Sequence, residues 1–408
     1  MSHSWRSQSR IAFCAAGLVL AALVIVGCSN LLTTEPPAGE RFDQPLAGLS
    51  NGELGDFQDG HTQFRKAFTI NEGLGPIFNN VSCAACHSGD GRGVTGNTLT
   101  RFSRGTDLDY AEGGPQLQDK AVPGATPERL PSGVDVSYRL PPPVFGVGLI
   151  EAIPDSAILA GEDPGDANAD GISGRANWVT PASYLPSDDP GAGPSRVGRF
   201  GRKAANSSLI QQVTEAYHQD MGITSPYRPT ENVNPAAPAA SGADPAPEPE
   251  VSEAKISDIA QYMRMLAPPS PGEMSPARER GQTLFAGAHC TGCHTPVMHT
   301  GWHEIEALRN RDAQLYSDLL LHDMGDALAD NRPDGSADGH EWRTAPLWGL
   351  RIAREFLGGD LLLLHDGRAH SVDEAVRLHG GEAAAARDAY IAMPVDDKAA
   401  LVDFVESR

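Results

Sequence analysis

Two copies of the pentapeptide Cys-x-x-Cys-His constrain this chain more than any other feature. They stand at residues 83–87 and 290–294, about two hundred residues apart. In each copy the two thiols can form thioethers with the vinyl groups of a haem, and the histidine that follows can ligate the iron from the proximal side. The residues assigned in this way are Cys83, Cys86, His87, Cys290, Cys293 and His294.

The cysteine count supports the same interpretation. The chain has six cysteines, and the two outside the motifs are Cys14 and Cys28 near the N-terminus, so none remains for a disulfide. A zinc site could use two Cys-x-x-Cys pairs, but it would not require a histidine directly after both of them. A redox dithiol would need a βαβ context, which the sequence does not show. We therefore expect two haem c groups.

The N-terminus predicts export. Arg6 and Arg10 precede an apolar run over residues 11–26, which is shorter than a comfortable membrane span. The run ends in Ile-Val-Gly-Cys, which resembles a bacterial lipobox with Cys28 as the lipidated first residue. Ser29 follows, which favours outer-membrane sorting. The expected location is the bacterial cell envelope, with a lipoprotein facing the periplasm; a transmembrane anchor is the alternative.

Charge limits the partners. The formal net charge is −21, and removal of residues 1–27 takes away two arginines and no acids, which makes it −23. Such a chain is unsuited to nucleic acid or to an anionic lipid surface, so the lipid anchor is the only membrane contact expected. A basic redox partner protein would suit it.

Helix signals occur in the same order around each motif. A helix near residues 57–68 precedes the first motif, and Ser252 starts a helix with an apolar stripe well after it. Ser275-Pro276 starts a helix before the second motif, and the chain ends on another helix. This pattern predicts a mostly α fold with two cytochrome c-like domains, each wrapped around one covalently attached haem. The expected division is a signal peptide over 1–27, a tether over 28–54, and domains over 55–269 and 270–408, with long irregular segments and an exposed Ala/Pro-rich loop over 233–251.

Five further segments resemble the dihaem oxidoreductase family, which is similar to bacterial dihaem cytochrome c peroxidases and to the dihaem enzyme that matures tryptophan tryptophylquinone. They lie at residues 73–80, 198–201, 220–224, 316–325 and 341–349, and the resemblance covers roughly residues 55–407. Members are also named thiol oxidoreductases, but no free cysteine remains here to support that name.

The resemblance suggests a distal ligand for the second haem. In the peroxidases a His-Asp-Gly stretch and a helix start precede the distal methionine of the C-terminal haem. Here the stretch begins at His365, Ser371 and Glu374 form a capping box, and His379 stands where the peroxidases have methionine. His379 is thus the expected ligand, with Met393 as the alternative. A plain helix-end histidine is the structural alternative, and His365 would contact a haem propionate or serve the fold.

The first haem has two interpretations. No His or Met occurs between His87 and His218, so the dissociable histidine of the peroxidases is absent. Met221 could ligate the iron, as methionine does in ordinary cytochromes c. Alternatively the position is open to peroxide, and Glu151 is the candidate catalytic acid that would move the peroxide proton; a surface glutamate is its structural alternative.

A calcium loop is expected over residues 166–172. Asp166, Asn168 and Asp170 offer side-chain oxygens at positions one, three and five, and Ile172 offers a carbonyl at position seven. Position twelve is Asn177 rather than the usual glutamate, so Glu162 or Asp163 would complete the shell. An Asp/Asn/Gly turn without metal is the alternative.

These assignments predict a peroxidase-like oxidoreductase. Electrons from a redox partner would enter at the C-terminal haem and pass to the N-terminal haem, where peroxide or another small molecule would react. One of Trp302, Trp342 and Trp348 could lie between the haems. The alternative function is pure electron transfer with both haems six-coordinate, and a third is an accessory role in iron acquisition.

Overall fold

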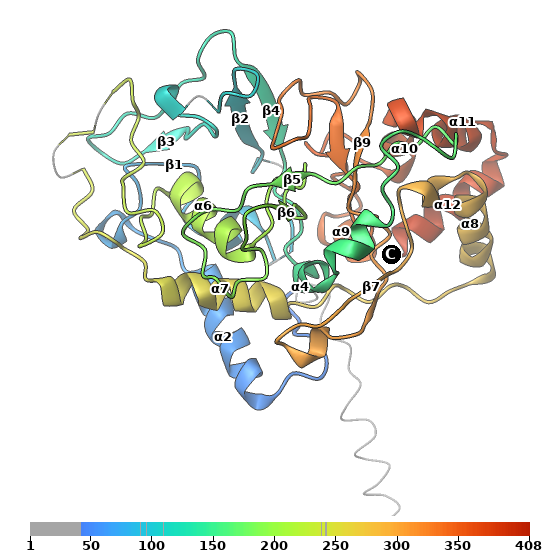
Figure 1. Ribbon diagram of the computed structural model, residues 1–408, viewed down its shortest axis with the longest axis horizontal. Coiled ribbons are helices and arrows are strands. Elements are labelled where there is room, and N and C mark those ends of the chain that lie inside the picture. Colours follow the sequence, from blue (N-terminus) through green and yellow to red (C-terminus); the bar gives the residue numbers. More distant parts are fainter. Residues whose placement is uncertain (1–41, 90, 95, 109, 238, 241–242) are drawn as a thin grey trace, which may run out of the picture. The chain divides into compact units, whose positions relative to one another are not determined.

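A computed structural model describes residues 42–89, 91–94, 96–108, 110–237, 239–240 and 243–408 (Figure 1). The predicted signal peptide and the lipidation site at Cys28 lie outside the described residues. Within the described part of the chain, no helix is both long and apolar enough to cross a membrane.

The described part is mostly helical, as the sequence predicts. Its α-helices are α2 (Asn51–Arg65), α3 (Cys83–Cys86), α4 (Val147–Ala152), α5 (Asp155–Leu159), α6 (Leu209–Met221), α7 (Glu253–Met265), α8 (Pro276–Gly287), α9 (Leu350–Phe356), α10 (Val372–Leu378), α11 (Ala384–Ala392) and α12 (Val395–Glu406). Short 3-10 turns are η2 (Ile70–Glu72), η3 (Tyr110–Glu112), η4 (Cys290–Gly292), η5 (Glu306–Leu308) and η6 (Gly381–Ala383).

Small antiparallel sheets of two strands each punctuate the irregular segments. The strand pairs are β1 (Ile77–Phe78) with β3 (Lys120–Ala121), β2 (Leu99–Ser103) with β4 (Asp135–Arg139), β5 (Trp178–Val179) with β6 (Arg196–Val197), β7 (Met298–His299) with β8 (Asp312–Ala313), and β9 (Leu321–Asp323) with β10 (Glu341–Arg343).

The first motif is enclosed by a helix pair, α2 and α7, which pack against each other (Figure 1). Ser50 and Glu53 form a capping box that starts α2, and Ser252 accepts a hydrogen bond from the Lys255 amide to start α7. At the crossing, Gly60 lies so close that a Cβ there would be 2.6 Å from the Cβ of Tyr262. A glycine therefore permits the close approach of the two helices.

The second motif is enclosed in the same way by α8 and α12, which lie side by side in Figure 1. Ser275 caps α8, and Pro276 occupies its first turn. A Cβ at Gly281 would be 2.6 Å from the Cβ of Phe404. The predicted order of helix, motif and closing helix thus occurs twice, with a glycine facing an aromatic residue at each crossing.

Two boundaries differ from the sequence prediction. The sequence predicts a tether that reaches residue 54. In the structure, however, Phe42 is buried and stacks on Phe145 with ring centroids 5.2 Å apart, and the Leu46 amide donates to Met265 O. Any tether therefore ends before Phe42, and α2 begins earlier than expected. The described part of the 233–251 loop is irregular but not wholly exposed, because Asn234 is buried and donates to the carbonyls of Thr126 and Pro127.

Candidate haem centres

Both motifs face a single cavity. Its volume is about 890 Å³, near the upper end of the range of roughly 300–1,000 Å³ that is usual for ligand sites. All six motif residues line it: Cys83, Cys86, His87, Cys290, Cys293 and His294. The fold therefore brings together two attachment sites that are far apart in the sequence.

At the first motif, the side chain of Ser82 caps α3, so that the helix carries both cysteines and ends at His87. Phe64 of α2 lies beside His87, with ring centroids 6.1 Å apart. Burial raises the pKa of the Cys86 thiol to about 11. An environment that disfavours a thiolate is compatible with an uncharged thioether.

At the second motif, the orientation of His294 is fixed by the backbone. Its Nδ1 is 2.9 Å from the carbonyl oxygen of Tyr316, and Phe285 of α8 lies beside its ring at 6.2 Å. Burial lowers the pKa of His294 to about 4. A neutral imidazole that donates from Nδ1 leaves its Nε2 lone pair available to a metal.

His379, the predicted distal ligand, has the same arrangement of its ring. It lies at the C-terminal end of α10 and lines the cavity, with Nδ1 2.7 Å from the carbonyl oxygen of Ala375. Burial lowers its pKa too. Met393, the alternative ligand, is not among the described residues that line the cavity. Ser371 caps α10 as expected, but the Glu374 carboxylate accepts from the His370 amide, so the capping box is incomplete.

The candidates at the first haem are placed differently from one another. Met221, the last residue of α6, is buried and lines the cavity. Glu151 is not among the described lining residues; its carboxylate accepts hydrogen bonds from Arg264 (2.6 Å) and lies 3.2 Å from His303. Burial alone would raise the pKa of Glu151, but these two partners lower it to about 2. Asp220 does line the cavity, and burial raises its pKa to about 6.

Four arginines that are buried or half-buried line the cavity, and none has a carboxylate partner among the described residues. Within the described chain, these four make no ion pair at 4 Å or less: Arg92, Arg101, Arg202 and Arg343. Burial lowers the pKa of each, to about 9 for Arg202 and about 10 for the other three. An unpaired buried cation is costly. Two haems would bring four propionates to the cavity, and the arginines could pair with these negative charges. No local sequence pattern predicts this set of arginines, because they come from four distant segments.

The aromatic candidates separate into two groups. Trp342 and Trp348 line the cavity, whereas Trp302 is 78% exposed. Trp342 stacks on His365 with ring centroids 3.8 Å apart, and the Lys203 ammonium lies 4.4 Å from its ring centre. Burial lowers the pKa of His365 to about 4, which keeps the stacked imidazole neutral.

In the expected calcium loop, the side-chain oxygens accept hydrogen bonds from backbone amides of the same loop. Asp166 accepts from the Gly171 amide, Asn168 Oδ1 from the Asp170 amide, and Asp170 from the Ile172 amide at 2.9 Å. Asp163 accepts from the amides of Ala167 and Asn168, and Glu162 from that of Ala176. Asn177 is fully buried elsewhere, where its amide donates to the carbonyls of Lys203 and Asp334.

Comparison with known proteins identifies the family of this chain. The search of curated proteins found no match. Solved structures that are similar to the chain include a MauG-like protein associated with microbial copper homeostasis (16% identity, 92% of this chain and 94% of that chain, TM-score 0.40). Two others are the dihaem peroxidase BthA from Burkholderia thailandensis (13%, 92% and 89%, 0.40) and the hydrazine synthase of Kuenenia stuttgartiensis (14%, 92% and 93%, 0.38). The sequence profile described as "Di-haem oxidoreductase, putative peroxidase" matches residues 28–104 and 119–408. The chain belongs to this di-haem oxidoreductase family, which implies two haems.

Proposed function

We propose that this protein is a dihaem c-type oxidoreductase that reduces hydrogen peroxide. One peroxide, two electrons and two protons would give two waters. The observation that carries the proposal is that both attachment motifs face one cavity, so that electrons could pass between the two groups inside the protein. Each haem, when bound, supplies an iron that accepts and donates single electrons.

The second centre suits electron entry. His294 and His379 both line the cavity, and each has Nδ1 hydrogen-bonded to a backbone carbonyl. Two imidazole ligands would close this centre to exogenous molecules and give it a lower potential than a His/Met pair. Electrons would therefore run from the second centre to the first.

The first centre suits the chemistry if Met221 does not hold its iron. Asp220 is an acidic residue close to this motif, since its charge raises the pKa of Cys86 after the larger effect of burial. It lines the cavity and accepts a hydrogen bond from Gln116. A carboxyl group with a pKa of about 6 can both hold and release a proton near neutral pH. We propose Asp220, rather than the ion-paired Glu151, as the proton source.

A second function has its own support. Met221 is buried in the wall of the same cavity, where its thioether could occupy the distal position of the first haem. With both centres six-coordinate, the protein would be an electron carrier without chemistry of its own.

Ligand access separates the two functions. Cyanide and carbon monoxide would be added to oxidised, half-reduced and fully reduced protein, with peroxide turnover measured in parallel. The peroxidase proposal expects binding at one haem and turnover that falls in Asp220→Asn but not in Glu151→Gln. Inert haems in the wild type, with ligand binding only in Met221→Ala, would establish the carrier.

We also propose that the protein is exported and lipid-anchored through Cys28, with a redox partner in the periplasm and calcium at residues 166–172. The residue pattern around Cys28 and the spacing of Asp166, Asn168 and Asp170 support these points. Cys28→Ser should move the protein from the membrane fraction to the soluble periplasmic fraction. Recovery in the membrane fraction would contradict the anchor.

A further inference from the structure

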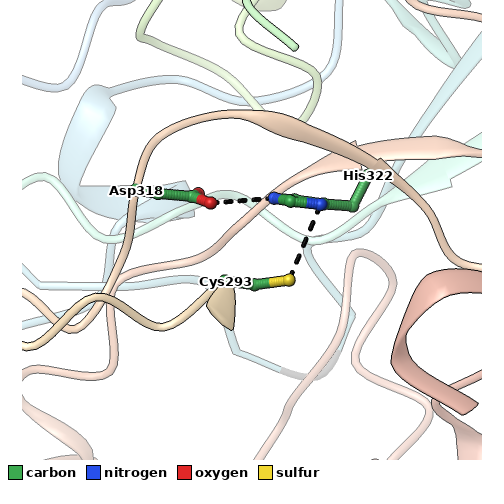
Figure 2. Close-up of side chains that lie close together, drawn as sticks. All are labelled: Cys293, Asp318 and His322. Carbon is green, nitrogen blue, oxygen red and sulfur yellow. Dashed lines mark hydrogen bonds and ion pairs between the residues drawn. The ribbon is translucent and has the colours of Figure 1, made fainter. Parts of the chain in front are cut away.

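A buried histidine beside the second motif has carboxylates at both ring nitrogens. His322 of β9 is 2% exposed, with Nε2 2.8 Å from an Asp318 oxygen and Nδ1 2.7 Å from a Glu382 oxygen. Nδ1 is also 3.6 Å from Sγ of Cys293 (Figure 2). Because ionised carboxylates only accept hydrogen bonds, both ring nitrogens must donate, and the ring is an imidazolium. Burial alone would lower the pKa of His322, but the hydrogen bonds to Asp318 and Glu382 raise it above the usual value of a histidine.

Glu382 links this imidazolium to the distal side of the second centre. It belongs to η6, three residues after His379. Its carboxylate also accepts hydrogen bonds from the Ser173 amide (3.0 Å), the Ser173 hydroxyl (2.8 Å) and the Asp323 amide (3.1 Å). A carboxylate with this many donors is held ionised and in one orientation.

Asp318 links the same imidazolium to the proximal side. Its backbone amide donates to the Cys293 carbonyl at 3.0 Å, and its carboxylate accepts from the Leu320 amide. The Asp318–His322–Glu382 triad therefore connects the attachment motif with the segment that carries His379. Both His322 and Glu382 line the cavity.

A metal site is the competing interpretation. Cys293, Asp318 and His322 hold their ligand atoms within 4.8 Å of one another. However, a Cys293 that forms a thioether has no thiolate to offer, and both nitrogens of His322 already donate to carboxylates. A metal would have to displace one of these bonds.

We propose that the triad positions the second haem and sets its reduction potential, an inference that rests on haem attachment at the second motif. Two carboxylates and one imidazolium give the triad a net charge of −1 beside the thioether. Buried charge is weakly screened, so a change in this charge alters the balance between the ferrous and ferric states. Loss of the cation should favour ferric iron, and loss of a carboxylate should favour ferrous iron.

The test is a redox titration of four proteins, with haem content measured in each. His322→Gln changes the triad charge to −2 and should lower the potential of the second haem. Glu382→Gln changes it to 0 and should raise that potential. The double variant returns to −1 and should return towards the wild type, and the first haem should change least in all of them.

The control is His340→Gln. His340 has a side chain 38% exposed and an ion-pair partner, Asp326, at 3.2 Å, but it is not among the described cavity-lining residues. It should leave both potentials unchanged. The charge role would be overturned if His322→Gln and Glu382→Gln shifted the potential of the second haem in the same direction, or if neither shifted it. It would also be overturned if the wild type bound one zinc ion per chain and His322→Gln abolished this binding. A wild-type chain without covalent haem would instead defeat the proposed function itself.

Discussion

An imidazole can ligate a metal only through a nitrogen that carries no proton, and backbone carbonyls decide this for two histidines of the chain. The Nδ1 atoms of His294 and His379 lie 2.9 and 2.7 Å from the carbonyl oxygens of Tyr316 and Ala375. Each carbonyl accepts a hydrogen bond from the Nδ1–H group, which keeps the proton on Nδ1 and leaves Nε2 with its lone pair. His322 differs from both, because each of its ring nitrogens donates to a carboxylate and neither has a free lone pair for a metal.

His379→Ala should therefore change the second haem alone. We expect a low-spin signal in electron paramagnetic resonance to be replaced by a high-spin signal, because one strong axial ligand is lost. Met393→Leu is the control, as Met393 is not among the described cavity-lining residues. If His379→Ala kept the wild-type spectrum while Met393→Leu altered it, the methionine would be the ligand.

Glycines decide how closely the paired helices approach. Gly60 faces Asp258 and Tyr262 of α7, and Gly281 faces Ala400 and Phe404 of α12. In each pair an aromatic residue one turn further along, Phe64 or Phe285, lies beside the histidine of the motif. The same local design thus occurs at both motifs, although the sequence signal for it is only a glycine and an aromatic residue four positions apart.

Two glycines of α2 give a matched comparison. A Cβ at Gly60 would collide with Asp258 O and lie 2.6 Å from the Tyr262 Cβ, whereas one at Gly55 would meet nothing within 4 Å. Gly60→Ala should destabilise the protein by about 1–3 kcal/mol through overpacking. Gly55→Ala should stabilise it by about 0.5–1 kcal/mol through helix propensity. Thermal melting measures both, and equal effects of the two substitutions would contradict the close crossing.

The irregular segment over 231–250 should make stability depend on pH. Burial, with the nearby charge of Glu248, raises the pKa of Glu250 to about 7, and burial also raises that of Glu231. Glu231, Asp244 and Glu250 form a cluster in which one carboxylate oxygen of each residue lies within 4.8 Å of the others. A carboxyl group with a raised folded-state pKa stabilises the fold below its unfolded pKa, and this contribution is lost as the pH rises through the folded value.

Glu250→Gln should remove part of this loss, because the amide stays neutral. In chelator-containing buffer, the melting temperature of the wild type should fall between about pH 5 and 8, and that of Glu250→Gln should fall less. Glu253→Gln, at the exposed start of α7, should follow the wild type. Parallel curves for all three proteins would show that Glu250 does not titrate in this range.

At the scale of the whole molecule, local patterns were predictable from sequence and long-range pairings were not. The attachment motifs and the caps at Ser252 and Ser275 involve neighbours in sequence, so their geometry follows from spacing. Glu151 pairs with Arg264, 113 residues away, and no local sequence pattern predicts that ion pair. The resemblance brought His379 to attention, but only the fold shows that it lines the cavity that the motifs face.

Because both motifs face one cavity, we expect the haems to contribute to the stability of the fold. A cavity of about 890 Å³ is unfavourable without an occupant when the arginines in its wall form no ion pair with the described carboxylates. The protein should carry two haems that resist acid–acetone extraction, as measured by pyridine haemochrome and intact mass. Cys83→Ala with Cys86→Ala should leave one haem, and the protein should then melt at a lower temperature and be cut sooner by protease near α2 and α7. A control substitution at the exposed Trp302, Trp302→Phe, should keep both haems and the wild-type melting temperature. An unchanged melting temperature after loss of the first haem would mean that the cavity is stable without its occupant, and the arginines would then need another explanation.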